Sequence, residues 1–152
     1  MKKTLLIAVL SLAVIIGFTL NLFSQTRPDV MVKQRQAVMT LQGKYFGPLG
    51  GMAQGKIPYN AEIIARNAGY LELLSQMPWD GFDVSTAKEK SRALPSVFTE
   101  QAKFKKAADD MQAAVKRLAS VSKGKDEALT KAAIGAVGKS CGDCHDAYRQ
   151  KD

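Results

Sequence analysis

The chain has 152 residues, which suits one ordinary domain and is enough to bury a core without disulfide cross-links. Its formal charge is +8 at pH 7, but Lys and Arg are spread along the chain and interleaved with Asp and Glu. This distribution argues against nucleic acid as a partner, because phosphate-binding segments concentrate their basic residues in blocks. We expect a solvated basic surface that attracts an acidic partner protein.

The first 24 residues have the composition of a secretory signal peptide. Lys2 and Lys3 precede an uncharged, apolar run from Leu5 to Leu20, which matches the basic and hydrophobic regions of such a signal. Cleavage after Ser24 would leave residues 25–152 as the mature domain, with a charge of 8 − 2 = +6. The alternative is an uncleaved anchor, since the run is close to the minimum of about 17 residues that spans a bilayer. Both alternatives export the domain, and the periplasm is the expected compartment.

The segment from about Asp29 to Leu49 has the periodicity of an amphipathic helix. Asp29 follows Pro28 and is the expected N-cap. Gly47-Pro48 and Gly50-Gly51 are expected to close the helix. One stripe at helical spacing contains Arg35, Met39, Gln42 and Phe46, and a second contains Val38, Leu41, Tyr45 and Leu49.

A second helix is predicted from about Asn60 to Gln76, with Asn60 as its N-cap and Pro78 beyond its end. Its expected inner face contains Ile63, Asn67, Tyr70, Leu71 and Leu74. Residues 78–95 then form an unusually long connection for a compact domain. We expect Trp79 and Phe82 to pin this connection onto the bundle.

Two further helices are predicted, from about Ser96 to Ser122 and from Asp126 to Gln150. Gly124 is the expected C-cap of the first and Asp126 the N-cap of the second. The last helix contains Gly135 and Gly138, and such residues weaken a helix unless a bulky planar group approaches the backbone. Four amphipathic helices without an alternating strand predict an all-α, antiparallel four-helix bundle.

The clearest chemical signal is the C-x-x-C-H pattern of Cys141, Cys144 and His145, which is typical of covalent haem attachment. On a helix, positions i, i+3 and i+4 lie on one face. Both thiols can therefore react with the two vinyl groups of one haem, while the imidazole ligates the iron. The chain has two cysteines and one histidine, and all of them belong to this pattern.

Other interpretations of the pattern explain less of it. A structural zinc site needs a fourth ligand, and the chain has no further Cys or His. A thioredoxin-like pair is expected beside a strand, which the sequence does not predict. A plain disulfide between Cys141 and Cys144 is compatible with export but gives His145 no role.

Motifs spread over residues 26–152 resemble the cytochrome c′ family. They are Arg35-Gln36 followed by Met39, Phe46-Gly47-Pro48, Lys56-x-Pro58-Tyr59, Pro78-Trp79, Gly138-Lys139-x-Cys141 and Tyr148-Arg149. The resemblance implies a four-helix bundle with one haem c between its helices. It also implies that His145 is the proximal ligand, that Arg149 lies on the proximal side, and that Arg35 and Gln36 bind the haem propionates. The alternative interpretation is that Arg149 is a solvated cation near a helix end and that Arg35 is a surface arginine.

Met39 bears on two functions that the resemblance implies. It aligns with the distal position over the iron, where an apolar wall leaves the iron five-coordinate and able to bind nitric oxide and carbon monoxide. Relatives of the c-556 type instead place a methionine sulfur on the iron and carry electrons. Other members with methionine at this position still leave the iron five-coordinate, and a methionine at helical spacing is also common in ordinary cores, so Met39 by itself is compatible with both functions. Phe46 is expected to wall the same pocket, although ordinary core packing explains it equally well.

The resemblance also implies a homodimer that pairs through the first two helices. We do not expect an enzyme, because no carboxylate pair, second histidine or nucleophile constellation is present.

Overall fold

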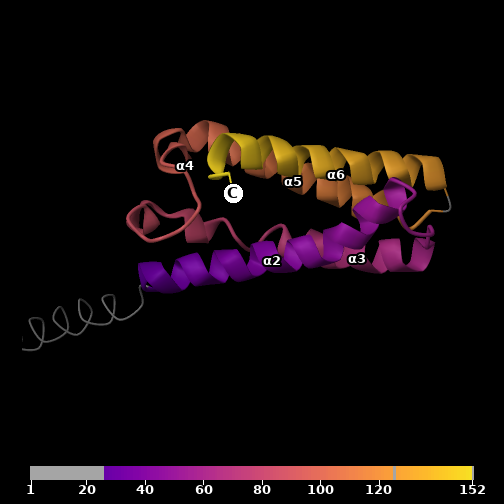
Figure 1. The fold of residues 1–152 in the computed structure, drawn as a ribbon, viewed down its shortest axis with the longest axis horizontal. Helices are drawn as coiled ribbons and strands as arrows, with labels where there is room; N and C mark the ends of the chain where they lie inside the picture. Colours follow the sequence, from indigo (N-terminus) through magenta and orange to yellow (C-terminus); the bar gives the residue numbers. More distant parts are fainter. Residues whose placement is uncertain (1–25, 125, 152) are drawn as a thin grey trace, which may run out of the picture.

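The computed structural model describes residues 26–124 and 126–151, so the predicted signal segment, residues 1–24, lies outside the described residues. The long helices in these ranges are α2 (Pro28–Ala53), α3 (Ala61–Leu74), α5 (Gln101–Val121) and α6 (Glu127–Tyr148). They form two layers, α2 with α3 and α5 with α6 (Figure 1). The predicted all-α, antiparallel four-helix bundle is therefore confirmed. None of the helices in the described ranges is long and apolar enough to cross a membrane.

The first helix, α2, is longer at both ends than the sequence predicts. Pro28 occupies the first turn and Arg27 is the N-cap residue, so the prediction that Asp29 caps the helix is wrong. The helix also continues through Pro48 and ends at Ala53, although a proline in a helix interior costs about 3 kcal/mol. Burial of Leu49 and Met52 beyond the proline explains why the helix does not stop there.

The predicted N-cap of α3 is confirmed, because the Asn60 side chain accepts a hydrogen bond from the Ile63 amide at 2.9 Å. The buried face of α3 differs in part from the predicted one. Tyr70, which was expected inside, is 43% exposed and packs against the Tyr45 ring at a centroid distance of 4.9 Å. The buried residues of α3 are Ile64, Asn67, Ala68 and Leu71.

The predicted continuous helix from Ser96 to Ser122 is wrong. A one-turn helix, α4 (Ser96–Thr99), is separated from α5 by Glu100, whose φ of −115° and ψ of 44° are not helical. The reason is a tertiary tie to the end of α6, where the Leu94 amide donates to the Tyr148 carbonyl at 2.9 Å and Ser96 Oγ to the Ala147 carbonyl at 3.2 Å. The connection before α4 contains two short 3₁₀ helices, η1 (Asp80–Phe82) and η2 (Val84–Thr86).

The last helix begins as predicted, with the Asp126 carboxylate accepting from the Leu129 amide at 2.8 Å. It ends at Tyr148 rather than Gln150, because Arg149 turns to an extended conformation and pairs with Ala93. The explanation offered for the helix glycines holds only in part. A Cβ on Gly138 would lie 3.3 Å from the Phe46 ring, but one on Gly135 would have no neighbour within 4 Å.

Before α6, the turn differs from the prediction as well. Ser122 is the C-cap residue of α5, so Gly124 is not the cap. Of the glycines in the described ranges, Gly55 is the one with a positive φ, and it follows α2.

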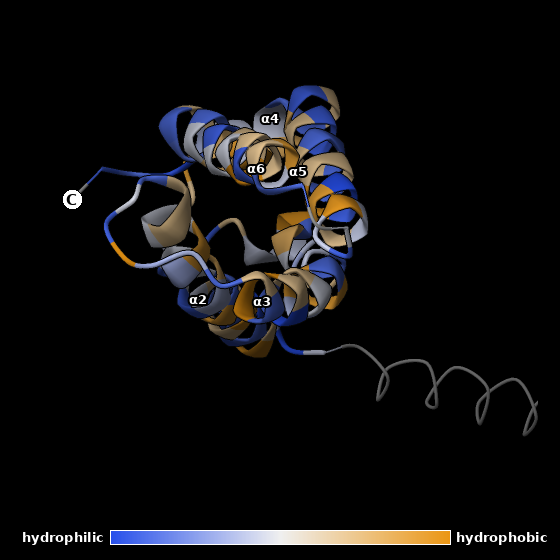
Figure 2. Cartoon of the chain, turned by 90° about the vertical axis from the view of Figure 1, so that its right-hand side faces the viewer, coloured by the Kyte–Doolittle hydropathy of each residue, from blue (hydrophilic) through white to orange (hydrophobic). Residues whose placement is uncertain are grey.

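The core lies between the two layers and consists of buried apolar side chains. Figure 2 shows the two layers, α2 with α3 and α5 with α6, on opposite sides of it. Its tightest part is at the end of the bundle where α2 ends and α6 begins, which we call the far end. The most buried large side chains there are Leu49, Ile64, Leu118 and Ile134. At the opposite end, the 78–95 connection, α4 and the C-terminus gather beside the start of α2 (Figure 1).

Candidate functional site

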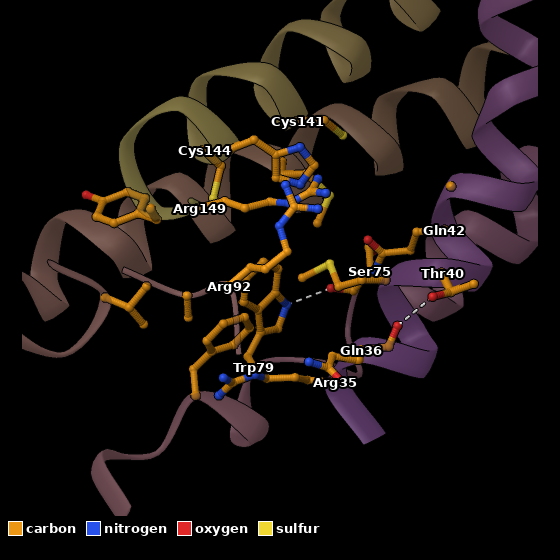
Figure 3. Close-up of a pocket in the computed structure, with 18 of the residues that line it drawn as sticks. Arg35, Gln36, Thr40, Gln42, Ser75, Trp79, Arg92, Cys141, Cys144 and Arg149 are labelled. Carbon is orange, nitrogen blue, oxygen red and sulfur yellow. Dashed lines mark hydrogen bonds between the residues drawn. The ribbon is translucent and has the colours of Figure 1, made fainter. Parts of the chain in front are cut away.

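A cavity of about 680 Å³ opens at the end of the bundle where α2 begins and α6 ends. This volume lies within the range of about 300–1,000 Å³ that is usual for small-molecule and cofactor sites. The structure brings every predicted site residue to its wall, namely Arg35, Gln36, Met39, Phe46, Cys141, Cys144, His145 and Arg149. Figure 3 shows the cysteines reaching it from α6 and Arg149 from just beyond the end of α6. Gln36 and Thr40 reach it from α2, and Trp79 and Arg92 from the connection between α3 and α4.

The α6 wall carries the C-x-x-C-H residues on one helical face, as their spacing predicts. Cys141 and Cys144 are partly buried and are not joined in a disulfide. Burial raises the pKa of the Cys141 thiol, and burial together with Cys141 raises that of Cys144, so both stay protonated at neutral pH. Two free thiols therefore face the cavity and are available for thioether formation.

The surroundings of the His145 imidazole favour its neutral form. Desolvation at the cavity wall lowers its pKa, and the positive charges of Arg149 and Arg92 lower it further. The neutral ring is the form that ligates a metal. Its position on the same face as both thiols matches the expected proximal ligand.

Arg35 on α2 is buried, with 3% of its surface exposed, so the interpretation of a surface arginine is wrong. Its guanidinium donates to the Gly81 carbonyl, to Thr86 Oγ1 at 2.9 Å and to Ser91 Oγ at 3.0 Å. It also lies 4.4 Å from the centre of the Phe82 ring. These partners are neutral, and within residues 26–124 and 126–151 no carboxylate forms an ion pair with Arg35. A buried cation with neutral partners favours an anion beside it.

The sequence did not reveal that Arg35 also anchors the 78–95 connection. A Cβ on Gly81 would lie 2.8 Å from Arg35 Cβ and 3.0 Å from the Met31 carbonyl oxygen. Glycine is therefore required where the connection crosses α2. The close approach allows the Gly81 carbonyl to accept the Arg35 hydrogen bond.

The remaining predicted residues of α2 complete the wall opposite α6. Met39 is partly buried, and Gln36 is exposed at the rim. The Phe46 ring lines the cavity and also packs on Gly138 of α6. Phe46 therefore combines the two roles that the sequence left open.

An aromatic cluster closes one side of the cavity, and the sequence identified only part of it. Trp79, Phe82, Phe104 and Tyr148 contact one another with ring centroids 4.9–6.1 Å apart. The Trp79 indole donates to the Ser75 carbonyl at 2.7 Å, which confirms that Trp79 and Phe82 pin the connection to the bundle. Arg92 was also missed, because its place beside α6 depends on pairing with residues far along the chain.

Together these walls fit a large, flat, partly charged group such as haem. Aromatic and aliphatic side chains line most of the cavity. Two thiols and an imidazole stand on one side. The buried guanidinium of Arg35, which has no carboxylate partner among the described residues, stands on the other. This set of donors suits two vinyl groups, an iron and a propionate, respectively.

Comparison with known proteins agrees with this reconstruction. The sequence model of the family described as cytochrome c′ matches residues 30–149. The chain is 38% identical over 126 residues to cytochrome c′ of Rubrivivax gelatinosus, covering 82% of this chain and 98% of that protein. It is 35% identical over 126 residues to cytochrome c-554 of Cereibacter sphaeroides, covering 80% of this chain and 94% of that protein.

A solved structure is similar as well. It is the nitric oxide complex of a single-residue variant of cytochrome c′ from Alcaligenes xylosoxidans, at a TM-score of 0.77 and 35% identity. The match covers 85% of this chain and 100% of that one.

Proposed function

This chain belongs to the cytochrome c′ family and its cofactor is haem c, and from that premise we propose a periplasmic protein in which His145 ligates the haem iron and the opposite face admits nitric oxide or carbon monoxide. The observation that carries the proposal is the single cavity wall formed by Cys141, Cys144 and His145, facing the Met39 side of α2. When bound, haem c supplies an iron that takes up small gases and changes between the ferric and ferrous states.

The predicted site residues divide into groups that hold the cofactor, ligate its iron, bind its propionates and form the wall opposite His145. Cys141 and Cys144 hold the cofactor covalently, and His145 presents a neutral nitrogen to the metal. Arg35 and Gln36 bind the propionates, and the buried charge of Arg35 favours such an anion. Met39 and Phe46 form an apolar wall that keeps water from the open face. The chain has no second histidine that could close this face.

Gas binding is supported by the relative from Alcaligenes xylosoxidans, whose structure was solved as a nitric oxide complex. Binding and electron exchange, rather than turnover of a substrate, are the activities we propose. The net charge of +8 favours an acidic protein as the redox partner.

Electron transfer with a six-coordinate iron is the second candidate. The position of the Met39 thioether on the cavity wall favours it, because such a ligand raises the reduction potential and suits an electron carrier. Partial burial of Met39 is compatible with either role.

Visible spectra of the ferric and ferrous holoprotein, with and without carbon monoxide, separate the two candidates. A high-spin spectrum that changes promptly with the gas supports the open iron, and a purely low-spin ferric spectrum contradicts it. Met39→Leu is the matched variant, since the two side chains have similar volumes. If Met39 ligates the iron, this variant becomes high spin, whereas an unchanged spectrum contradicts ligation.

Two properties of the intact protein complete the proposal. The basic and apolar N-terminal segment supports export to the periplasm. Purifying the protein from that compartment and measuring its mass tests this proposal.

Pairing of two copies through α2 and α3 is supported by exposed apolar residues on these helices, and sedimentation of the holoprotein measures it. These residues are Leu41, Tyr70 and Leu73.

A further inference from the structure

A short pairing between two distant segments closes the end of α6 just after His145. The Gln150 amide donates to the Arg92 carbonyl at 2.8 Å, and Arg92 Nη2 donates back to the Gln150 carbonyl at 2.9 Å. Ala93 and Arg149 form an antiparallel bridge next to this pair, and on its other side the Leu94 amide donates to the Tyr148 carbonyl at 2.9 Å. We call residues 92–94 and 148–150 the C-terminal bridge. It fixes the main chain of Arg92 and, through Nη2, the end of its side chain.

The bridge places two guanidinium-bearing residues beside His145. Arg92 and Arg149 both line the main cavity, and both line a neighbouring cleft of about 260 Å³ together with His145. The Arg149 amide donates to the His145 carbonyl at 3.1 Å, so the bridge directly continues the turn that carries the histidine.

The charged side chains described around the main cavity are mainly cations. Among residues 26–124 and 126–151, those that line it include Arg35, Arg92 and Arg149 but no aspartate or glutamate. Arg35 lies on α2, where it anchors the connection, whereas Arg92 and Arg149 lie with His145 on the opposite wall. The residues that line the neighbouring cleft also include the cation Lys151 and the acidic residue Asp146. Within the part of the chain that the structure describes, the histidine wall therefore carries more cationic than anionic side chains.

We propose that Arg92 is a second functional cation on the histidine side of the haem, which acts with Arg149 to raise the reduction potential and is held in place by the C-terminal bridge. This inference rests on the proposed ligation of the haem iron by His145. Reduction adds an electron, so a fixed positive charge near the iron stabilises the ferrous state. The effect is stronger at a partly buried site, where solvent screens the charge less.

Reduction potentials of the holoprotein and four variants test the proposal. Arg92→Gln removes the charge, Arg92→Lys keeps it, and Arg149→Gln removes the neighbouring one. Lys139→Gln is the matched control, since Lys139 is a cation of α6 that is exposed, pairs with Asp143 and does not line the cavity. We expect Arg92→Gln and Arg149→Gln to lower the potential, Arg92→Lys to leave it close to the original, and Lys139→Gln to change it least.

Amide hydrogen exchange at Leu94 and Gln150, measured on the same proteins, separates charge from structure. If the potential follows the loss of amide protection rather than the charge, or if Arg92→Gln shifts it no more than Lys139→Gln, the proposal is overturned. The ferric and ferrous spectra of the unsubstituted protein report independently on ligation by His145. A failure of the proposed function is therefore visible before any Arg92 variant is compared.

Discussion

The two ends of the bundle are made from the same four helices but are filled in different ways. At the far end, Leu49, Ile64, Leu118 and Ile134 are each at most 1% exposed and pack on one another's helices. At the cavity end, Met39 and the two cysteines are only partly buried around a space of about 680 Å³. The buried polar groups differ as well, since the charged Arg35 lies at the cavity end.

This difference separates stability from function along one set of helices. The far end is complete with its own side chains, so its apolar burial stabilises the fold whatever the cavity binds. The cavity end arranges thiols, an imidazole and cations whose burial costs free energy that a bound group can offset. Substitutions at the two ends should therefore affect different measurements.

Removal of both attachment residues should have the largest effect. We expect the double variant Cys141→Ala/Cys144→Ala to lose covalent haem completely, because the chain has no other cysteine. Haem staining after denaturing electrophoresis measures the loss. Amides of the far end should exchange more slowly than those of the cavity end in this variant, since the far-end core contains neither cysteine. Covalent haem in the double variant would contradict the attachment, and uniform exchange would contradict the separation of the two ends.

A matched pair of leucine substitutions sharpens the comparison. Leu118 lies in the far-end core, whereas Leu71 belongs to the same core cluster but also lines the cavity. We expect Leu118→Ala to lower the free energy of unfolding by about 2–5 kcal/mol, measured by denaturant titration of the holoprotein. Its haem spectrum should not change, because Leu118 does not contact the cavity. Leu71→Ala should change both, and a spectral change in Leu118→Ala alone would contradict this division.

The sequence predicts the cavity end better than the connections around it. The stripe of Arg35, Met39 and Phe46 follows from helical spacing, and all three residues line the cavity. The C-x-x-C-H pattern is local as well, since its residues share one face of one helix. Features that depend on periodicity within a single helix are therefore visible without a structure.

Features that depend on distant segments are not visible in this way. The continuation of α2 past Pro48 depends on how well Leu49 and Met52 pack, and the break at Glu100 depends on bonds to the end of α6. Arg92 lines the same cavity as His145, in a segment whose backbone pairs with Gln150 beyond the end of α6. Local propensities contain no information on these contacts, so tertiary packing overrides them.

Two glycine-to-alanine substitutions give the smallest and most sensitive test, because each adds one methyl group. At Gly81 the new Cβ would lie 2.8 Å from Arg35 Cβ and 3.0 Å from the Met31 carbonyl oxygen. Both residues belong to α2, so the connection must shift. We expect Gly81→Ala to lower the free energy of unfolding by about 1–3 kcal/mol. Gly135 is exposed within α6 and has open space around the position of a Cβ, so Gly135→Ala should raise it by up to about 1 kcal/mol. Denaturant titration of the two holoproteins measures both changes. If Gly81→Ala leaves the free energy of unfolding unchanged, Arg35 does not need this close approach to hold the connection.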